Sequence, residues 1–160
     1  MVLTATQEDY LEAIHRLEEE GEQVQVTHLA DRLGCRLPTV TRTLKKLVGS
    51  GFVDHESRGT VHLTESGRAT ARHLVHRHDD LAKFLSLVLG LSPGESEKDA
   101  CQLEHGMSAL AAQRLHRWLQ HLDQLDASAR DRALRFRGRD ADAVPDFDWL
   151  PDGKTVGWRG

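Results

Sequence analysis

The chain has 160 residues, of which 39% are hydrophobic and 29% charged, and its net charge is −4. This balance fits one or two small folded domains and excludes a disordered chain. No apolar stretch approaches the roughly 20 residues of a membrane span, and the start lacks the pattern of a secretory signal. Two cysteines, Cys35 and Cys101, are too few for a disulfide framework and favour a reducing cytosol.

The charge is distributed unevenly along the chain. Residues 1–31 contain one basic residue against eight acidic ones, whereas residues 32–72 contain eight basic residues against three acidic ones. A local basic surface attracts phosphates even where the total charge is negative. Residues 32–72 are therefore a candidate DNA-binding segment, and an ordinary solvated surface is the alternative reading of the same composition.

Three helices are predicted first. Thr6 is a candidate cap for a first helix that ends at Gly21, and Thr27 for a short second helix that ends at Gly34. Pro38 suits the first turn of a third helix, "PTVTRTLKKLVGS", because proline is tolerated where the backbone N–H has no helical partner. The spacing of apolar residues inside each segment is helical.

A hairpin follows the three helices. The segments "FVDH" and "TVHLT" alternate apolar with polar residues, and Gly59 in the "ESRG" between them can supply a positive φ. Three helices followed by a hairpin, in this order, predict a winged helix-turn-helix domain over residues 1–67.

The remainder is predicted to be a helical domain over residues 68–136. A long helix over about 65–89 is broken by "GLSPGES", and further helices cover about 95–107 and 108–126. The last of these is expected to bury one side formed by Leu110, Leu115, Trp118, Leu119 and Leu122. So few helices make a small core, which favours a homodimer. Residues 137–160 have no periodicity and are expected to form an irregular tail, so the fold class is mainly α.

Three groups of residues carry candidate metal chemistry. Cys101, Glu104 and His105 have i, i+3, i+4 spacing, which would place a sulfur, an oxygen and a nitrogen donor on one helical face. Asp9 and Glu12 form an i, i+3 carboxylate pair, and a third candidate lies on an apolar stripe at His78. Each group has a plainer reading as well: a free cysteine beside a solvated pair, surface acids, and a core histidine.

In combination these segments resemble the iron- and manganese-dependent repressors of the diphtheria toxin repressor/manganese transport regulator family. The resemblance covers about residues 6–118 and includes "EDYLEAIHRLEEEG", "LPTVTRTLKKL", "GTVHLTESGRATA", "LVHRHDDLAKFL" and "ACQLEHGMS". It implies a homodimeric, metal-dependent repressor that binds operator DNA and controls metal-homeostasis genes.

The resemblance also implies a ligand set, which is Asp9, Glu12, His78, Cys101, Glu104 and His105. Cys101 stands where the manganese-type branch has a carboxylate and the iron-type branch a cysteine, whereas Asp9 stands where the iron-type branch has a methionine. Ala82 and Glu97 occupy positions at which the iron-type branch has a glutamate and a histidine as further ligands. We expect one compact site for one or two ions, with Fe(II) favoured narrowly over Mn(II) because of the thiolate.

The same resemblance implies DNA contacts. Base-reading positions match Pro38, Thr39, Thr41 and Arg42, with Arg36 just before them. Phosphate contacts are expected from Lys45, Lys46 and Arg58. Because the expected ligands lie on three separate segments, a bound ion would tie the first helix to the dimerisation domain and so set the spacing of two recognition helices.

Two other classes of function compete with this reading. One is a winged-helix regulator that responds to another signal, such as oxidation of Cys101. The other is a metalloenzyme, since carboxylate–histidine clusters also support hydrolysis. The sequence has no Gly-rich phosphate loop or nucleophile elbow, and a basic helix-turn-helix would have no role in an enzyme. We therefore expect a regulator and not an enzyme.

Overall fold

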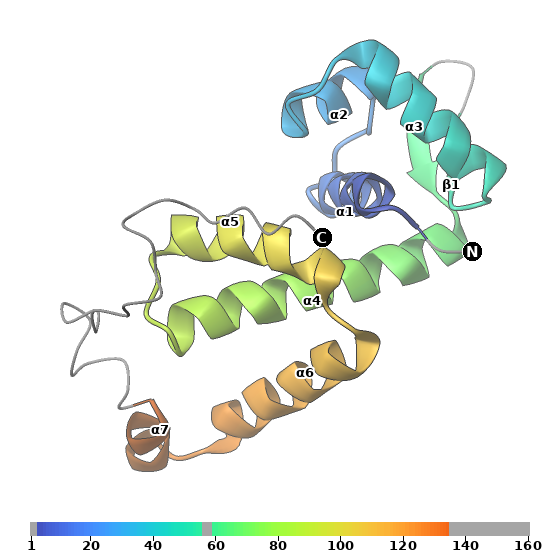
Figure 1. Ribbon diagram of the computed structural model, residues 1–160. Helices are drawn as coiled ribbons and strands as arrows, with labels where there is room; N and C mark the ends of the chain where they lie inside the picture. The colour runs from blue at the N-terminus through green and yellow to red at the C-terminus, as the bar shows by residue number, and fades with distance from the viewer. Residues whose placement is uncertain (1–2, 56–58, 135–160) are drawn as a thin grey trace.

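A computed structural model describes residues 3–55 and 59–134 of the chain, and this part is mainly helical (Figure 1). The elements in chain order are α1 (Ala5–Glu19), α2 (Val26–Arg32), α3 (Leu37–Gly49), β1 (Val53–His55), β2 (Val61–Leu63), α4 (Glu65–Leu87), α5 (Pro93–Leu103), the 3-10 turn η1 (Glu104–Gly106), α6 (Ala109–Gln124) and α7 (Ala127–Ala133). None of the described helices is long and apolar enough to cross a membrane.

The amino-terminal lobe is a winged helix-turn-helix, as predicted. Strands β1 and β2 pair antiparallel, with Val53 opposite Leu63, and Gly59 between them has a φ of 84°. The expected core positions of α3 are buried, at Val40, Leu44 and Leu47. These side chains join those of α1, α2 and the hairpin in one continuous core, so the opposite face of α3 is left to solvent.

Both predicted caps of the first two helices are wrong. Helix α1 is capped by Thr4, whose hydroxyl accepts from the backbone N–H of Gln7 while the Gln7 side chain accepts from the backbone N–H of Thr4. This reciprocal arrangement favours Thr4 over Thr6. Helix α2 follows Gln25, whose extended backbone is bridged to Thr60 of the wing. A tertiary contact therefore sets the start of α2.

Helix α4 belongs to both lobes. Its Ala71 and Leu74 complete the amino-terminal core, and Leu81 and Leu85, about two and three turns after Leu74, belong to the second core. Figure 1 shows α4 running beneath α1 and then alongside α5. At its beginning, Gly67 lies so close to the Phe52 carbonyl that any side chain there would clash. A single rigid helix thus connects the wing to the helical lobe.

The second lobe has a small core. Its buried apolar residues on α4 and α5 are Leu81, Ala82, Leu85 and Ala100. Helix α5 begins at Pro93, behind a capping box formed by Ser92 and Glu95, and so starts two residues before the predicted position. An additional short helix, α7, is capped by Asp126 and was not predicted. The predicted irregular tail over 137–160 lies outside the described residues.

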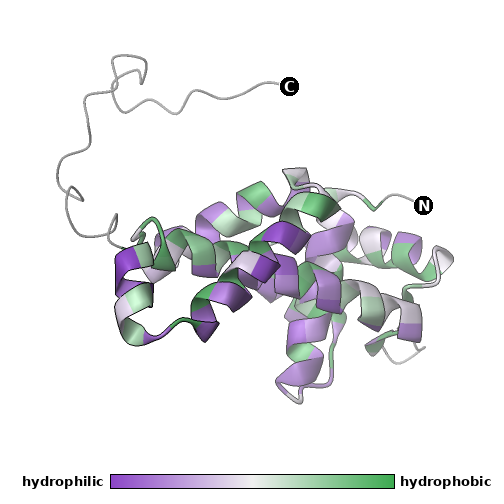
Figure 2. Ribbon diagram, turned by 90° about the horizontal axis from the view of Figure 1, so that it is seen from below, coloured by the Kyte–Doolittle hydropathy of each residue, from purple (hydrophilic) through white to green (hydrophobic). Residues whose placement is uncertain are grey.

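Helix α6 buries less than its sequence predicted. Leu119 and Leu122 are buried, but Leu110 is 57% exposed and Trp118 is 38% exposed, with the Trp118 ring edge-on to Phe84 at 5.8 Å between centroids. The expectation of one fully buried side is therefore wrong for Leu110 and Trp118. In the hydropathy colouring of Figure 2 the helices carry both polar and apolar residues, and apolar side chains remain at the surface of a single chain.

Candidate metal centre and DNA-binding surface

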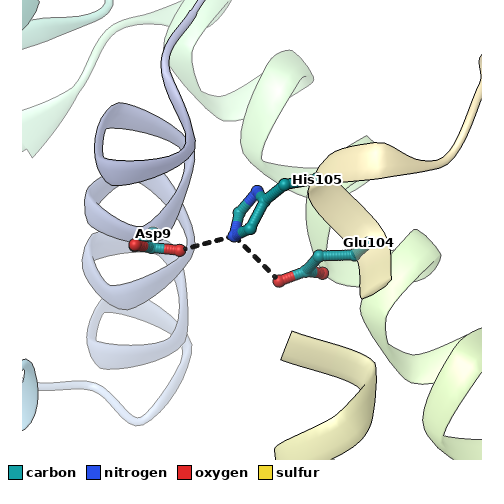
Figure 3. Close-up of side chains that lie close together, drawn as sticks. All are labelled: Asp9, Glu104 and His105. Carbon is teal, nitrogen blue, oxygen red and sulfur yellow. Dashed lines mark ion pairs between the residues drawn. The ribbon is translucent and has the colours of Figure 1, made fainter. Parts of the chain in front are cut away.

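Acidic and histidine side chains from three elements meet where α1, α4 and η1 pack together. Two groups have potential ligand atoms within 4.8 Å of one another: Asp9, Glu104 and His105 form the first, and Glu12, His78 and Glu104 form the second. Figure 3 shows the imidazole of His105 between Asp9 on α1 and Glu104. Five of the six residues predicted as ligands therefore lie in one cluster.

Glu104 belongs to both groups and is the most buried member of the cluster. Its side chain is 1% exposed, with Oε2 lying 3.3 Å from His78 Nδ1 and Oε1 lying 3.6 Å from His105 Nε2. Each carboxylate oxygen thus faces a different group. This is the geometry by which one carboxylate can bridge two cations.

Three buried atoms of the second group make no well-formed hydrogen bond within the described residues, although two of them, His78 Nδ1 and Glu104 Oε2, lie 3.3 Å apart as an ion pair. They are Glu12 Oε1, His78 Nδ1 and Glu104 Oε2. Buried polar atoms are almost always paired, because an unpaired one loses its hydration without compensation. All three can donate a lone pair to a cation. The residues present therefore fit a divalent metal ion, which would satisfy these atoms together.

The electrostatics of the cluster point the same way. Burial, with help from the neighbouring Glu104, raises the pKa of Glu12 to about 7. Glu104, followed by Glu97, raises the pKa of His78 to about 9 against the opposing effect of burial. Burial also raises the pKa of Asp9. Without a metal the cluster therefore holds protons to balance its own negative charge, and a cation would have to displace them.

Cys101 is placed differently from the prediction. The expected helix over 95–107 ends at Leu103, and Glu104 and His105 lie in the 3-10 turn, which the backbone N–H of Met107 closes on the Glu104 carbonyl at 3.2 Å. Glu104 is buried, whereas Cys101 is exposed and lies outside both groups. The predicted helix over 95–107 is therefore too long, and Cys101 as a ligand beside Glu104 and His105 stays a prediction. Burial and the charges of Glu104, Asp9 and Glu12 raise the pKa of the Cys101 thiol. The thiol is therefore close enough to the cluster to be affected by its charges.

Two carboxylates that sequence reasoning did not assign to the site contact the histidines from outside. Glu8 Oε2 lies 2.9 Å from His105 Nδ1 and also accepts from Arg77 at 2.7 Å. Glu97 Oε2 lies 2.8 Å from His78 Nε2. In the sequence Glu8 is an ordinary first-turn acid and Glu97 only a departure from the family pattern, so neither carried a signal of this contact.

The predicted DNA-contacting residues of α3 lie at the surface. Arg36 is the N-cap of α3, and the helix exposes the others, which are Pro38, Thr39, Thr41, Arg42, Lys45 and Lys46. The Thr41 hydroxyl donates to the Leu37 carbonyl at 3.0 Å, so its methyl group is the part left for contact. Arg58 lies outside the described residues.

A winged helix-turn-helix with a basic outer helix, joined to a second helical lobe through a carboxylate–histidine cluster, defines a metal-dependent DNA-binding regulator. Comparison with protein families agrees. Residues 2–61 match the iron dependent repressor N-terminal DNA binding domain, and residues 64–127 match the iron dependent repressor metal binding and dimerisation domain. The chain belongs to the iron-dependent repressor family, whose characterised members are metal-dependent transcriptional repressors.

Individual relatives are similar over most of the described chain. The diphtheria toxin repressor of Corynebacterium diphtheriae is 33% identical over 113 residues, which are 71% of this chain and 50% of that protein. The transcriptional regulator MntR of Bacillus subtilis is 29% identical over 128 residues, 80% of this chain and 89% of that protein. A solved manganese-dependent transcriptional repressor in complex with manganese superposes with a TM-score of 0.67 at 36% identity, covering 71% of this chain and 52% of that one. The chain thus spans about half the length of two of these relatives.

Proposed function

We propose that this chain is a repressor of metal-homeostasis genes that binds operator DNA as a homodimer when Fe(II) or Mn(II) occupies the cluster. The observation that carries the proposal is the buried carboxylate of Glu104, which faces both groups at once and whose Oε2 makes no well-formed hydrogen bond among the described residues beside its 3.3 Å ion pair with His78. The ligands proposed are Asp9, Glu12, His78, Glu104 and His105, with Cys101 as a sixth. Two ions per chain are proposed, one in each group.

The metal proposed is Fe(II), with Mn(II) as the competing ion. The two groups offer only oxygen and nitrogen donors, which suit both ions, and a Cys101 thiolate would favour Fe(II). Substitution with Co(II) separates these cases, because a thiolate ligand adds a charge-transfer absorption in the near ultraviolet. Loss of that band in Cys101→Ser would assign the thiolate to the site and support Fe(II), and its absence in the wild-type protein would favour Mn(II).

The residues of the cluster suggest how a bound metal would control the position of the amino-terminal lobe. Helices α1 and α4 are already joined by ion pairs, with Arg16 2.7 Å from Asp79 and Arg68 2.6 Å from Glu18. The contact between α1 and η1 depends instead on the ion pairs of His105 with Glu8 and Asp9 of α1. A bound cation would neutralise the cluster and hold α1 against η1. The chain would then have two arrangements, one with α1 held against η1 and one with this contact loosened. Metal would raise DNA affinity only as far as it binds the first arrangement more tightly than the second.

DNA recognition is proposed for the exposed face of α3. Arg42, with Arg36 before the helix, is proposed to read bases, and Thr39 and the exposed methyl group of Thr41 are proposed to contact base edges. Lys45 and Lys46 are proposed to contact phosphates. Arg58 of the wing is proposed for the same role from its place in the sequence.

The test is selection of genomic DNA fragments by the anaerobically purified chain, supplied with Fe(II), with Mn(II) or with a chelator. We expect the same fragments to be enriched with one or both metals and not with the chelator. The double variant Asp9→Ala/Glu104→Ala should lose the metal-dependent enrichment. Equal enrichment with and without metal would disprove the proposed control.

A further inference from the structure

The two histidines of the cluster differ in which ring nitrogen is held from outside. His105 contacts an outer carboxylate, Glu8, through Nδ1 at 2.9 Å, and His78 contacts an outer carboxylate, Glu97, through Nε2 at 2.8 Å. Their other nitrogens face the proposed ligands: His105 Nε2 lies 2.9 Å from Asp9 and 3.6 Å from Glu104, and His78 Nδ1 lies 3.3 Å from Glu104. The inward-facing nitrogens are therefore of opposite type.

We infer that Glu8 and Glu97 are positioning residues that fix the tautomers of the two histidines, so that a metal pair would be bound by His105 Nε2 and His78 Nδ1. This inference rests on the proposed function. A histidine that donates its remaining N–H to a carboxylate is held in one ring orientation and becomes a more basic ligand. Each outer carboxylate selects the nitrogen that remains available to the metal.

Arg77 makes the selection at His105 strict. Its guanidinium donates at 2.7 Å to the same oxygen, Glu8 Oε2, that lies 2.9 Å from His105 Nδ1. A positive charge therefore already occupies the Nδ1 side of the ring, and a metal cation there would be repelled. The side chains of Glu8 and Arg77 are 18% and 16% exposed, so water screens this arrangement little.

The contact at His78 is less protected. The Glu97 side chain is 66% exposed, and water can replace it as the acceptor for His78 Nε2. Inside, by contrast, His78 Nδ1 is buried and makes no well-formed hydrogen bond in the described part of the chain. Glu97 is therefore expected to contribute less to metal affinity than Glu8.

The experiment is long-range ¹H–¹⁵N correlation NMR of the full chain with ¹⁵N-labelled histidine, before and after addition of Zn(II) as a diamagnetic probe. We expect the metal-bound shift at Nε2 of His105 and at Nδ1 of His78, with a proton on the other nitrogen of each ring. A metal-bound shift at the opposite nitrogen of either residue would overturn the inference while leaving the metal centre intact. If Zn(II) shifted the signals of neither histidine, both this inference and the proposed metal centre would be overturned.

Variants test the positioning role separately. Glu8→Gln should lower Zn(II) affinity by about 10- to 100-fold and add the second tautomer of His105 to the metal-free spectrum recorded at a pH where the ring is neutral, whereas Glu97→Gln should have a smaller effect on affinity. Glu19→Gln is the matched control, because Glu19 lies on the same helix but faces His15. Wild-type affinity and a single His105 tautomer in Glu8→Gln would refute the role of Glu8.

Discussion

Glu104→Gln removes the one charge that both groups share while keeping the size of the side chain. In the metal-free protein two effects oppose each other. The rise in the pKa of His78 from 6.5 to about 9 corresponds to about 3 kcal/mol of favourable interaction, and Glu104 is its largest cause. In the variant, however, Glu12 no longer faces the like charge of Glu104, which helps to raise the pKa of Glu12 to about 7, and the loss of this repulsion is favourable. We therefore expect the two effects largely to offset each other in the free energy of unfolding without metal.

The metal-dependent stability should change much more. A metal at 100 times its Kd stabilises the folded state by about 2.7 kcal/mol, which for a chain of this length raises Tm by roughly 5–10 °C. A site weakened a hundredfold is only about half filled at the same concentration and contributes about 0.4 kcal/mol. Glu104→Gln should thus lose nearly all of the Mn(II)-induced rise in Tm.

The assay is thermal unfolding of wild type and variant with a fixed Mn(II) concentration and with a chelator. Glu65→Gln, which neutralises an exposed acid at the start of α4, is the control and should keep the full rise. If Glu104→Gln kept a wild-type rise in Tm on Mn(II) addition, Glu104 could not be a shared ligand and the proposed centre would be refuted.

Further predictions concern protons, dimerisation and DNA. Because the pKa of Glu12 is about 7 and that of His78 about 9 in the folded metal-free protein, metal binding at pH 7 should release more than about one proton per chain, and affinity should rise from pH 6 to 8 in calorimetric titrations. Both raised values also mean that the stability these groups give the metal-free protein is lost as pH rises through about 7 and then about 9. Leu103→Glu, at a side chain 52% exposed, should shift the sedimentation equilibrium towards monomer. Arg42→Ala should lower affinity for selected DNA by about 1–3 kcal/mol, whereas Lys46→Ala should mainly reduce the salt dependence, by about one in the log–log slope.

The dimer and salt-dependence predictions have matched controls, and the pH prediction has a clear contrary outcome. Metal affinity that does not change between pH 6 and 8 would contradict the proton balance of the cluster. Val48→Glu adds the same charge at an exposed apolar position of the amino-terminal lobe and should leave the dimer intact. If Val48→Glu and Leu103→Glu weakened the dimer equally, Leu103 would not be part of the dimer interface. Lys98→Ala removes an exposed lysine from α5 and should not alter the salt slope. An unchanged slope in Lys46→Ala would exclude a phosphate contact.

Periodicity along the chain was enough to predict most of the elements, though not η1 or α7. The helical spacing of Val40, Leu44 and Leu47 and the alternation around Gly59 correctly predicted α3 and the hairpin, because each pattern depends on neighbours within one element. Helix ends were predicted less well. The competition between Thr4 and Thr6 was decided by a capping box, and the start of α2 by a bridge from Gln25 to the wing.

By itself the sequence determined the fold class, the order of the elements and the residue types that can bind a cation. Only the tertiary structure decided that α5 stops at Leu103, that Glu104 lies buried between two histidines and that Cys101 stays at the surface. The contacts of Glu8 and Glu97 with those histidines were likewise invisible in the sequence. The physical reason is that a periodic pattern fixes directions within one helix, whereas the meeting of α1, α4 and η1 depends on how separate helices pack and where their charges pair.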